Sequence, residues 1–195
     1  MTTKHKIEER INKSISVKKS LLENEKLIVD ISKAADAICR NMSNGGKVIL
    51  AGNGGSFADA QHLCAEFVSR LIVDRDPLPA IALGVNGSNF SAIGNDYGFE
   101  HVFSRELKSL YRENDIFIGI STSGKSPNII NALDTATELG CLAILLTGEK
   151  VIFPDSSILE INVPCAETMH IQESHIMIGH ILCEAVEHYF YGDRI

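Results

Sequence analysis

The segment Lys47-Val48-Ile49-Leu50-Ala51-Gly52-Asn53-Gly54-Gly55-Ser56 decides the fold class. Its first five residues, four of them apolar, stop at a glycine and are typical of a buried strand, and a helix is expected from Ser56 to Ser69. The same alternation continues, with strands predicted at 80–83, 115–120, 141–146 and 157–163 and helices at 127–139 and 169–191. Buried strands that alternate with helices predict an α/β fold, a three-layer sandwich in which a five-stranded parallel sheet is covered on both faces.

The chain before this segment is expected to be helical. Ile7, Ile11 and Ile15 recur at every fourth position, and Asn44-Gly45-Gly46 ends the helical pattern. We expect one or two long helices in residues 1–45, as an N-terminal segment of the same domain, whose main part spans 46–195. These helices should both cover a face of the sheet and pack on another subunit.

The composition is that of an ordinary globular protein. The chain has 195 residues, of which 45% are apolar and 22% charged, and a net charge of −7. This acidic balance, without a basic patch, argues against nucleic-acid and membrane partners. The longest purely apolar run, Cys141–Leu146, is far shorter than a membrane span, and no secretory signal is visible. The five cysteines form no CxxC pair, so we expect buried free thiols in a soluble, cytoplasmic protein.

Two loops that follow predicted strands have the composition of ligand-binding sites, and ligands of open parallel sheets bind beyond the carboxyl ends of the strands. The first is the glycine turn at 52–56, where the backbone can approach a ligand closely and Ser56 can cap the next helix. It matches neither the dinucleotide GxGxxG nor the Walker pattern. An ordinary tight turn between a strand and a helix has the same composition.

The second is the serine loop, Ser121-Thr122-Ser123-Gly124-Lys125-Ser126-Pro127, in which Ser126 is expected as the N-cap and Pro127 as the first helical residue. Hydroxyls beside the free N–H groups of a helix N-terminus predict a phosphate site. Hydroxyls hold a phosphoryl group without delivering a general acid to it, which indicates a handle on a substrate rather than phosphoryl transfer. A simple Ser/Thr-rich loop is the alternative.

Two helices carry candidate acid/base or metal-binding side chains. His62 and Glu66 project from one helix face, and Gln172 and His180 share a face of the last helix. A buried histidine beside a carboxylate is a usual way to build a general acid/base pair or a metal site. A surface His–Glu pair and a hydrogen-bonded core histidine remain alternatives. The histidines interpreted as structural are His5, His101, His175 and His188.

Four segments, at 51–66, 92–100, 119–128 and 171–180, together resemble the phosphoheptose isomerases of the sugar-isomerase (SIS) superfamily. The resemblance spans about residues 20–190 and implies the SIS fold and a homotetramer with active sites between subunits. It also implies an aldose–ketose isomerase that converts D-sedoheptulose 7-phosphate to D-glycero-D-manno-heptose 7-phosphate through an enediolate. The heptose would serve lipopolysaccharide or capsule biosynthesis.

The resemblance further implies roles for individual residues. Glu66 and His180 would be the acid/base pair, and Glu66 and Gln172 would also contact the substrate. One zinc ion per subunit would be held by His62, Glu66, Gln172 and His180. The substrate phosphate would be held by Ser56, Ser121, Thr122, Ser123 and Ser126, and the sugar by Asn53, Gly54, Gly55, Asn95 and Asp96. Proton transfer between adjacent sugar carbons needs such a base, an acid and a stabilising charge.

The sequence departs from the family pattern at Lys125, where asparagine is usual, and at His170, where arginine is usual, and neither change removes a catalytic position. The alternative function is a non-catalytic SIS-fold regulator, of the DnaA initiator-associating type, or a sugar-phosphate sensor. Such proteins would tolerate the loss of Glu66 and His180. Both residues are present, which favours the enzyme.

Overall fold

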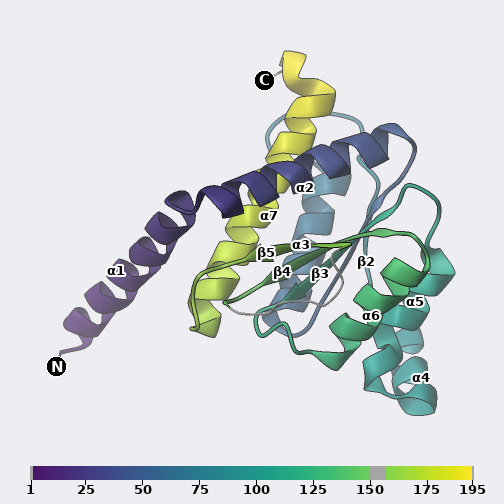
Figure 1. Ribbon diagram of the computed structural model, residues 1–195, viewed down its shortest axis with the longest axis horizontal. Coiled ribbons are helices and arrows are strands. Elements are labelled where there is room, and N and C mark those ends of the chain that lie inside the picture. The colour runs from purple at the N-terminus through teal and green to yellow at the C-terminus, as the bar shows by residue number, and fades with distance from the viewer. Residues whose placement is uncertain (1, 150–156, 195) are drawn as a thin grey trace.

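A five-stranded, all-parallel sheet with the order β2-β1-β3-β4-β5 forms the centre of the computed structural model, which describes residues 2–149 and 157–194. The strands are β1 (Val48–Gly52), β2 (Ala80–Ala82), β3 (Ile116–Ser121), β4 (Leu142–Thr147) and β5 (Ile158–Asn162). Each end lies within one residue of its predicted position. The α/β prediction with a five-stranded parallel sheet is therefore confirmed (Figure 1).

Seven α-helices surround the sheet in the described residues. They are α1 (Thr3–Leu22), α2 (Glu25–Ser43), α3 (Gly55–Val68), α4 (Gly87–Tyr97), α5 (Val102–Leu110), α6 (Pro127–Glu138) and α7 (Thr168–Tyr191). The sequence patterns give no bounds for α4 and α5. No residue of α4 is buried, so it lacks an apolar stripe, and α5 is only nine residues long.

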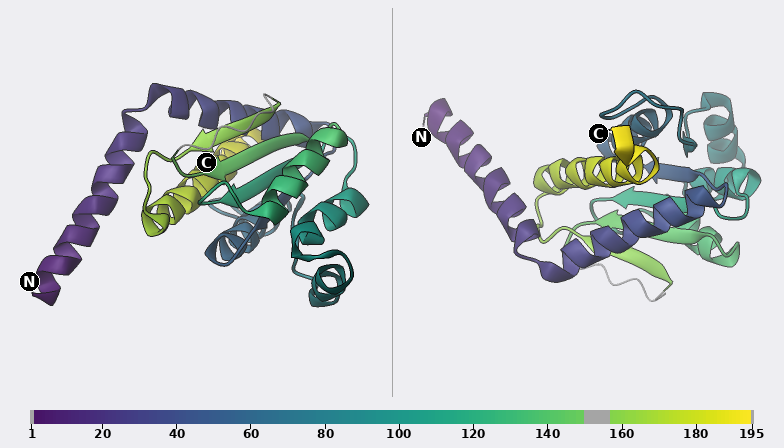
Figure 2. Two further views of the ribbon diagram at one scale, coloured as in Figure 1. Left: turned by 60° about the horizontal axis from the view of Figure 1, so that its bottom comes forward. Right: turned by 90° about the horizontal axis from the view of Figure 1, so that it is seen from above.

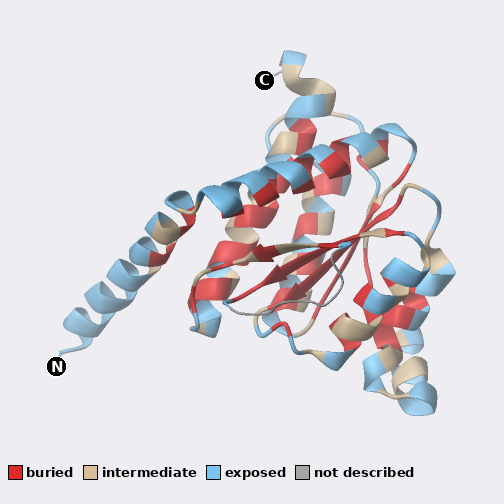
Figure 3. Cartoon of the chain, viewed as in Figure 1, coloured by how far each residue is buried: buried red, intermediate tan, exposed pale blue. Residues whose placement is uncertain are grey.

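The two faces of the sheet are covered by different helices, which gives three layers. Alternate strand residues point to opposite faces, so Leu50 and Ile118 pack on α2, α3 and α7. Ile49 and Phe117 pack on α5 and α6 instead. The strands of the centre are buried along most of their length (Figure 3), as expected for a parallel sheet between two helical layers.

The N-terminal helices have two different surroundings. The Asn24 side chain caps α2 by accepting a hydrogen bond from the N–H of Leu27, and α2 then packs along α7 and β5. In contrast, α1 projects away from the body of the molecule (Figure 2). Along it Ile7, Ile11 and Ile15 are about half exposed. The predicted cover of a sheet face therefore belongs to α2, while the predicted packing on another subunit stays a prediction.

The five cysteines are all free, and four of them are buried, as expected. Burial raises the pKa of Cys141 and of Cys183 to about 12, so these thiols are unreactive near neutral pH. Among the helices in the described residues, none combines the length and apolarity that crossing a bilayer requires.

Candidate active site

The site begins at the carboxyl ends of β1 and β3, which are neighbours in the sheet. From β1 the chain proceeds to β2 on one side, and from β3 it proceeds to β4 on the other. Open α/β sheets bind their ligands at such a topological switch point. The glycine turn follows β1 and the serine loop follows β3, so the fold brings the two predicted loops together.

The glycine turn starts α3 and leaves room for a side chain from α7. A Cβ on Gly55 would lie 2.1 Å from Nε2 of Gln172, so only glycine allows the Gln172 amide to approach this closely. The N-cap of α3 is Gly54, because the helix already begins at Gly55. The capping role predicted for Ser56 is therefore wrong, and Ser56 is a buried residue of the first turn.

The serine loop folds back on itself before α6. The Oγ atoms of Ser121 and Ser126 lie 3.1 Å apart, and Oγ of Ser123 accepts a hydrogen bond from the backbone two residues later. Ser126 is the N-cap and Pro127 the first residue of α6, as predicted, although the Ser126 hydroxyl contacts Ser121 rather than capping the helix. Ser123 is exposed and Thr122 half-buried, so hydroxyl groups are accessible beside the N-terminus of α6, an arrangement suited to binding an anion.

The side chain of Asn53 links the two loops through Asn128. Each amide donates to the other, over 2.8 Å and 2.9 Å. Asn128 is almost fully buried in the first turn of α6. The sequence patterns did not single out Asn128, and its place next to the serine loop is the only signal that could have done so.

His62, Glu66 and His180 meet where α3 and α7 pack together. The Nε2 atoms of His62 and His180 lie 2.9 Å apart, and Nε2 of His62 lies 3.4 Å from Oε1 of Glu66. One ligand atom from each residue lies within 4.8 Å of the other two. Gly179 permits this approach, because a Cβ there would lie 2.5 Å from the side chain of Leu63 on α3.

This donor set fits a divalent metal ion. Imidazole and carboxylate are common zinc ligands, with bonds of about 2.0–2.2 Å in a tetrahedral arrangement. Such bonds separate two donor atoms by roughly 3.3 Å, so small side-chain rotations would admit an ion between His62, Glu66 and His180. Gln172 lies on the same face of α7 as His180, two turns earlier, and can offer its amide oxygen as a further donor.

Asp59, which the sequence patterns did not single out, lies beside the same donors. It lines a groove of about 430 Å³ together with Gly55 and Gln172. Burial raises the pKa of Asp59, and the nearby His62 and His180 lower it by less. Its position three residues before His62, on the same helix face, is the signal that could have identified it.

Asn95 and Asp96 lie near the end of α4, and both are exposed. Nδ2 of Asn95 donates to Oδ1 of Asp96 over 2.8 Å. Helix α4 lies apart from α7 in every view (Figures 1 and 2). A single chain therefore does not bring these residues to the donor set, and their contact with a sugar stays a prediction.

An apolar cavity of about 360 Å³ opens beside the glycine turn. Its lining comes from the turn, from Gly84 and from four aromatic rings: Gly52, Asn53, Gly54, Phe57, Gly84, Phe90, Phe99 and Phe103. A cavity of this size accommodates a small ligand, with Asn53 as the polar group that could orient it.

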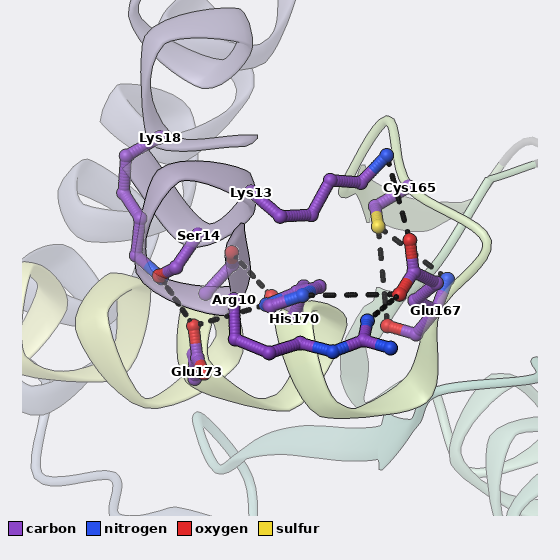
Figure 4. A network of polar contacts seen from close by, with 9 residues as sticks. Arg10, Lys13, Ser14, Lys18, Cys165, Glu167, His170 and Glu173 are labelled. Carbon is purple, nitrogen blue, oxygen red and sulfur yellow. Dashed lines mark hydrogen bonds and ion pairs between the residues drawn. The ribbon is translucent and has the colours of Figure 1, made fainter. Parts of the chain in front are cut away.

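A network of charged side chains fastens the start of α7, close to Gln172, onto α1 (Figure 4). Four side chains of α1 contact two glutamates: Arg10 and Lys13 pair with Glu167, and Ser14 and Lys18 contact Glu173. His170 is buried between these glutamates, 3.8 Å from Glu167 and 3.4 Å from Glu173. The histidine that departs from the usual family pattern thus belongs to this helix junction.

Known proteins share this sequence and architecture. A family model described as "SIS domain" matches residues 11–148. The phosphoheptose isomerase of Aneurinibacillus thermoaerophilus is 48% identical over 192 residues, which cover 96% of each chain. The phosphoheptose isomerase GmhA from Neisseria gonorrhoeae has a TM-score of 0.88 at 36% identity, over 95% of this chain and 99% of that one. A phosphoheptose isomerase structure from Francisella tularensis has a TM-score of 0.89 at 36% identity, over 95% and 98%.

The parallel sheet, the loops at its switch point and the family match define the class of protein: this is a SIS-domain protein. Its similarity extends over nearly the whole chain to enzymes of one activity. The chain belongs to the phosphoheptose isomerase family and is an isomerase, so the non-catalytic regulator is not favoured.

Proposed function

We propose that this enzyme converts D-sedoheptulose 7-phosphate to D-glycero-D-manno-heptose 7-phosphate, for the biosynthesis of lipopolysaccharide or capsule heptose. The observation that carries the proposal is the meeting of His62, Glu66 and His180 along α3 and α7. The glycine turn also supports the proposal, because it links the serine loop to the donor set. Its Asn53 hydrogen-bonds to Asn128, next to the serine loop, and its Gly55 lies against Gln172.

The first part of the proposal concerns a metal ion. One zinc ion per subunit would be held by His62, Glu66, Gln172 and His180. When bound, the ion polarises the substrate carbonyl and stabilises the negative charge that develops on the enediolate oxygens. Burial raises the pKa of the neighbouring Asp59, so this side of the site is partly desolvated.

The second part concerns the proton. Glu66 removes a proton from C1 of the open-chain ketose, and the electron pair of the broken C–H bond forms the C1–C2 double bond. The same carboxyl group then returns a proton to C2. His180 moves protons between the oxygens, so that O2 gains one and O1 loses one. Positioned general acids and bases of this kind contribute about 10²–10⁴-fold in rate.

The third part concerns the handle on the substrate. The phosphate would be held by Ser56, Ser121, Thr122, Ser123 and Ser126, beside the N-terminus of α6. The sugar would be held by Asn53, Gly54, Gly55, Asn95 and Asp96. Lys125 is exposed in the serine loop and adds a positive charge there. Neutral hydroxyls and backbone N–H groups suffice for phosphate, which explains how an acidic chain can bind an anion.

The fourth part concerns assembly. We propose a cytoplasmic homotetramer with active sites between subunits. Exposed apolar side chains on one projecting helix support such an interface, and they are Ile7, Ile11, Ile15 and Leu22. The free cysteines suit a reducing compartment. Light scattering on the purified chain would give the mass of the assembly directly.

The function is tested with zinc-loaded and chelator-treated protein, each mixed with sedoheptulose 7-phosphate while aldose formation is followed. We expect turnover by the zinc-loaded protein, its loss after chelation, and its return when Zn²⁺ is added back. Calorimetry on the same samples separates the alternatives. If the zinc-loaded protein binds sedoheptulose 7-phosphate without turnover, it is a sensor and the proposed reaction is wrong.

A further inference from the structure

A buried ion pair joins α7 to the segment that follows α3. Nε of Arg75 lies 2.7 Å from Oε2 of Glu187, and the two side chains are 1% and 0% exposed. The Glu187 carboxylate also accepts hydrogen bonds from the backbone N–H groups of Leu71, Ile72 and Val73, over 3.1, 2.8 and 2.9 Å. Burial raises the pKa of Glu187, but these donors and Arg75 outweigh it and lower the pKa to about 2.

The remaining donors of Arg75 hold the end of α3. Nη2 donates to the backbone carbonyl of Glu66 over 2.8 Å, and Nη1 donates to the carbonyls of Phe67 and Asp76 over 2.9 and 3.1 Å. The last carbonyls of a helix have no partner within the helix and carry its partial negative charge. Arg75 therefore fixes the turn of α3 from which the Glu66 side chain projects.

Three of the contacts between α7 and the α3 region come from Gln172, His180 and Glu187. Gln172 lies against Gly55, His180 meets His62, and Glu187 binds the segment just after α3. The three α7 residues are spaced by eight and seven positions, about two helical turns each, so they share one face of α7. The two helices thus run side by side in the same direction. The contact of His180 with His62 lies between the contact of Gln172 with Gly55 and that of Glu187 with the segment after α3.

The cost of this ion pair indicates a role other than stability. Two buried charges lose their hydration, and replacing such a pair by apolar residues is often neutral or stabilising. What the pair supplies is orientation, because a planar guanidinium with several fixed donors specifies one geometry. In this molecule that geometry includes the backbone of Glu66 and the helix that carries His180.

We propose that Arg75 and Glu187 are positioning residues for the metal site, which set the separation of α3 and α7 at which His62, Glu66 and His180 can share one ion. The inference rests on the proposed function, since it assumes that this donor set binds a metal. Neither residue touches the substrate or the ion. Arg75 acts through the backbone carbonyls at the end of α3, and Glu187 acts through Arg75 and the segment that follows α3.

The test compares metal affinity in Arg75→Lys and Glu187→Gln. Lysine keeps the charge but cannot reach Glu187 and both α3 carbonyls together, and glutamine keeps the shape but turns a donor toward Arg75. Asp115→Asn is the matched control. Asp115 is also buried and pairs with Lys47, but it joins β1 and β3 rather than the two helices. Co²⁺ is titrated into each metal-free protein and followed by its visible absorption, and Zn²⁺ is measured by competition.

We expect Arg75→Lys and Glu187→Gln to bind both ions at least about tenfold more weakly and to show an altered Co²⁺ spectrum, with circular dichroism like the parent. Asp115→Asn should lower the melting temperature yet keep metal affinity within about twofold. The proposal is wrong if the two variants bind Co²⁺ and Zn²⁺ like the parent, if Asp115→Asn loses as much affinity, or if neither variant folds, since the pair is then a folding requirement.

These results are separable from the fate of the proposed reaction. A parent protein that binds Zn²⁺ but produces no aldose would contradict the reaction and leave the positioning role intact. A parent that turns over, with variants whose Zn²⁺ affinity is unchanged, would contradict the positioning role alone.

Discussion

The amides of Asn53 and Asn128 exchange two hydrogen bonds, of 2.8 Å and 2.9 Å, and thereby join the glycine turn to the first turn of α6. The two loops come from different strands and have no covalent connection near the site. Because Asn128 is almost fully buried, its amide has few other ways to satisfy its polar atoms. The pair therefore sets the position of the serine loop relative to the glycine turn.

We predict that Asn128→Asp weakens substrate binding. A carboxylate cannot donate to Oδ1 of Asn53, and one lost buried hydrogen bond of about 1–1.5 kcal/mol corresponds to roughly a tenfold higher KM. The value of kcat should change by less than about threefold, because the proposed acid/base pair, Glu66 and His180, is untouched. Steady-state kinetics with sedoheptulose 7-phosphate measure both constants.

Asn131→Asp is the control for this prediction, because it places the same charge on α6 one turn later. There Nδ2 of Asn131 donates to the exposed backbone carbonyl of Glu100. Its KM should stay close to that of the parent. An equal rise of KM in both variants would show that the added charge, and not the link to Asn53, causes the effect.

We predict that Gly55→Ala lowers metal affinity with little loss of stability. The new Cβ would lie 2.1 Å from Nε2 of Gln172, which is the end of a flexible side chain and can swing away. Its amide would then leave the donor set, so Zn²⁺ affinity and turnover should each fall about tenfold, in the range seen when partners of a metal site are lost.

Gly87→Ala makes a matched control, since Gly87 is the first residue of α4 as Gly55 is of α3, and nothing lies within 4 Å of its added Cβ. This variant should keep the Zn²⁺ affinity and the rate. Competition titration with a coloured chelator supplies the affinities. Unchanged Zn²⁺ binding in Gly55→Ala would remove Gln172 from the donor set.

We predict that the enzyme loses stability as the pH falls from 6.5 to 4, in part through His175. Burial lowers the pKa of this fully buried histidine to about 4, against a smaller opposing effect of the Thr147 backbone. The unfolded chain therefore binds more protons than the folded one below pH 6.5, and acid favours unfolding. Relative to neutral pH, the free energy of unfolding should be lower by about 3 kcal/mol at pH 4 through His175 alone.

The measurement is urea unfolding at several pH values for the parent and for His175→Leu, which cannot titrate. Between pH 6.5 and 4, the free energy of unfolding should fall more steeply for the parent than for His175→Leu. Above pH 7 the stability curves of the two proteins should run in parallel. Parallel curves over the whole range would mean that His175 does not carry this acid sensitivity.

The order of strands and helices could be predicted because buried parallel strands leave a plain signal. Runs such as Ile116–Ser121 are wholly buried and contain no polar residue before the final Ser121, which fixes their ends to within a residue. Helix α4 has no buried residue and therefore no pattern of apolar positions that marks its ends, so its bounds could not be predicted. The start of α3 was misjudged by one residue because Gly54, rather than a polar residue, is its cap.

The composition of the glycine turn and the serine loop identified both loops as ligand-binding candidates, but spacing along the chain could place individual side chains together only where they share one helix. The spacing of His62 and Glu66 places them together, whereas nothing in the spacing of Asn53 and Asn128, or of Arg75 and Glu187, shows that they touch. Those contacts arise from tertiary packing over 75 and 112 residues of chain. The same limit applies to Gly179. A larger residue there would clash with Leu63, and this clash becomes visible only when α3 and α7 are packed together.

The central claim is that Glu66 transfers a proton between C1 and C2 of a ketose phosphate. It is tested most directly by proton NMR of sedoheptulose 7-phosphate mixed in D₂O with the zinc-loaded parent and with Glu66→Gln. The account predicts aldose signals with deuterium incorporated at C2 for the parent. It predicts a rate at least about 10³-fold lower for Glu66→Gln, which retains the parent's circular dichroism. A ketose that stays unchanged with the parent, or aldose formed equally fast by Glu66→Gln, would contradict it.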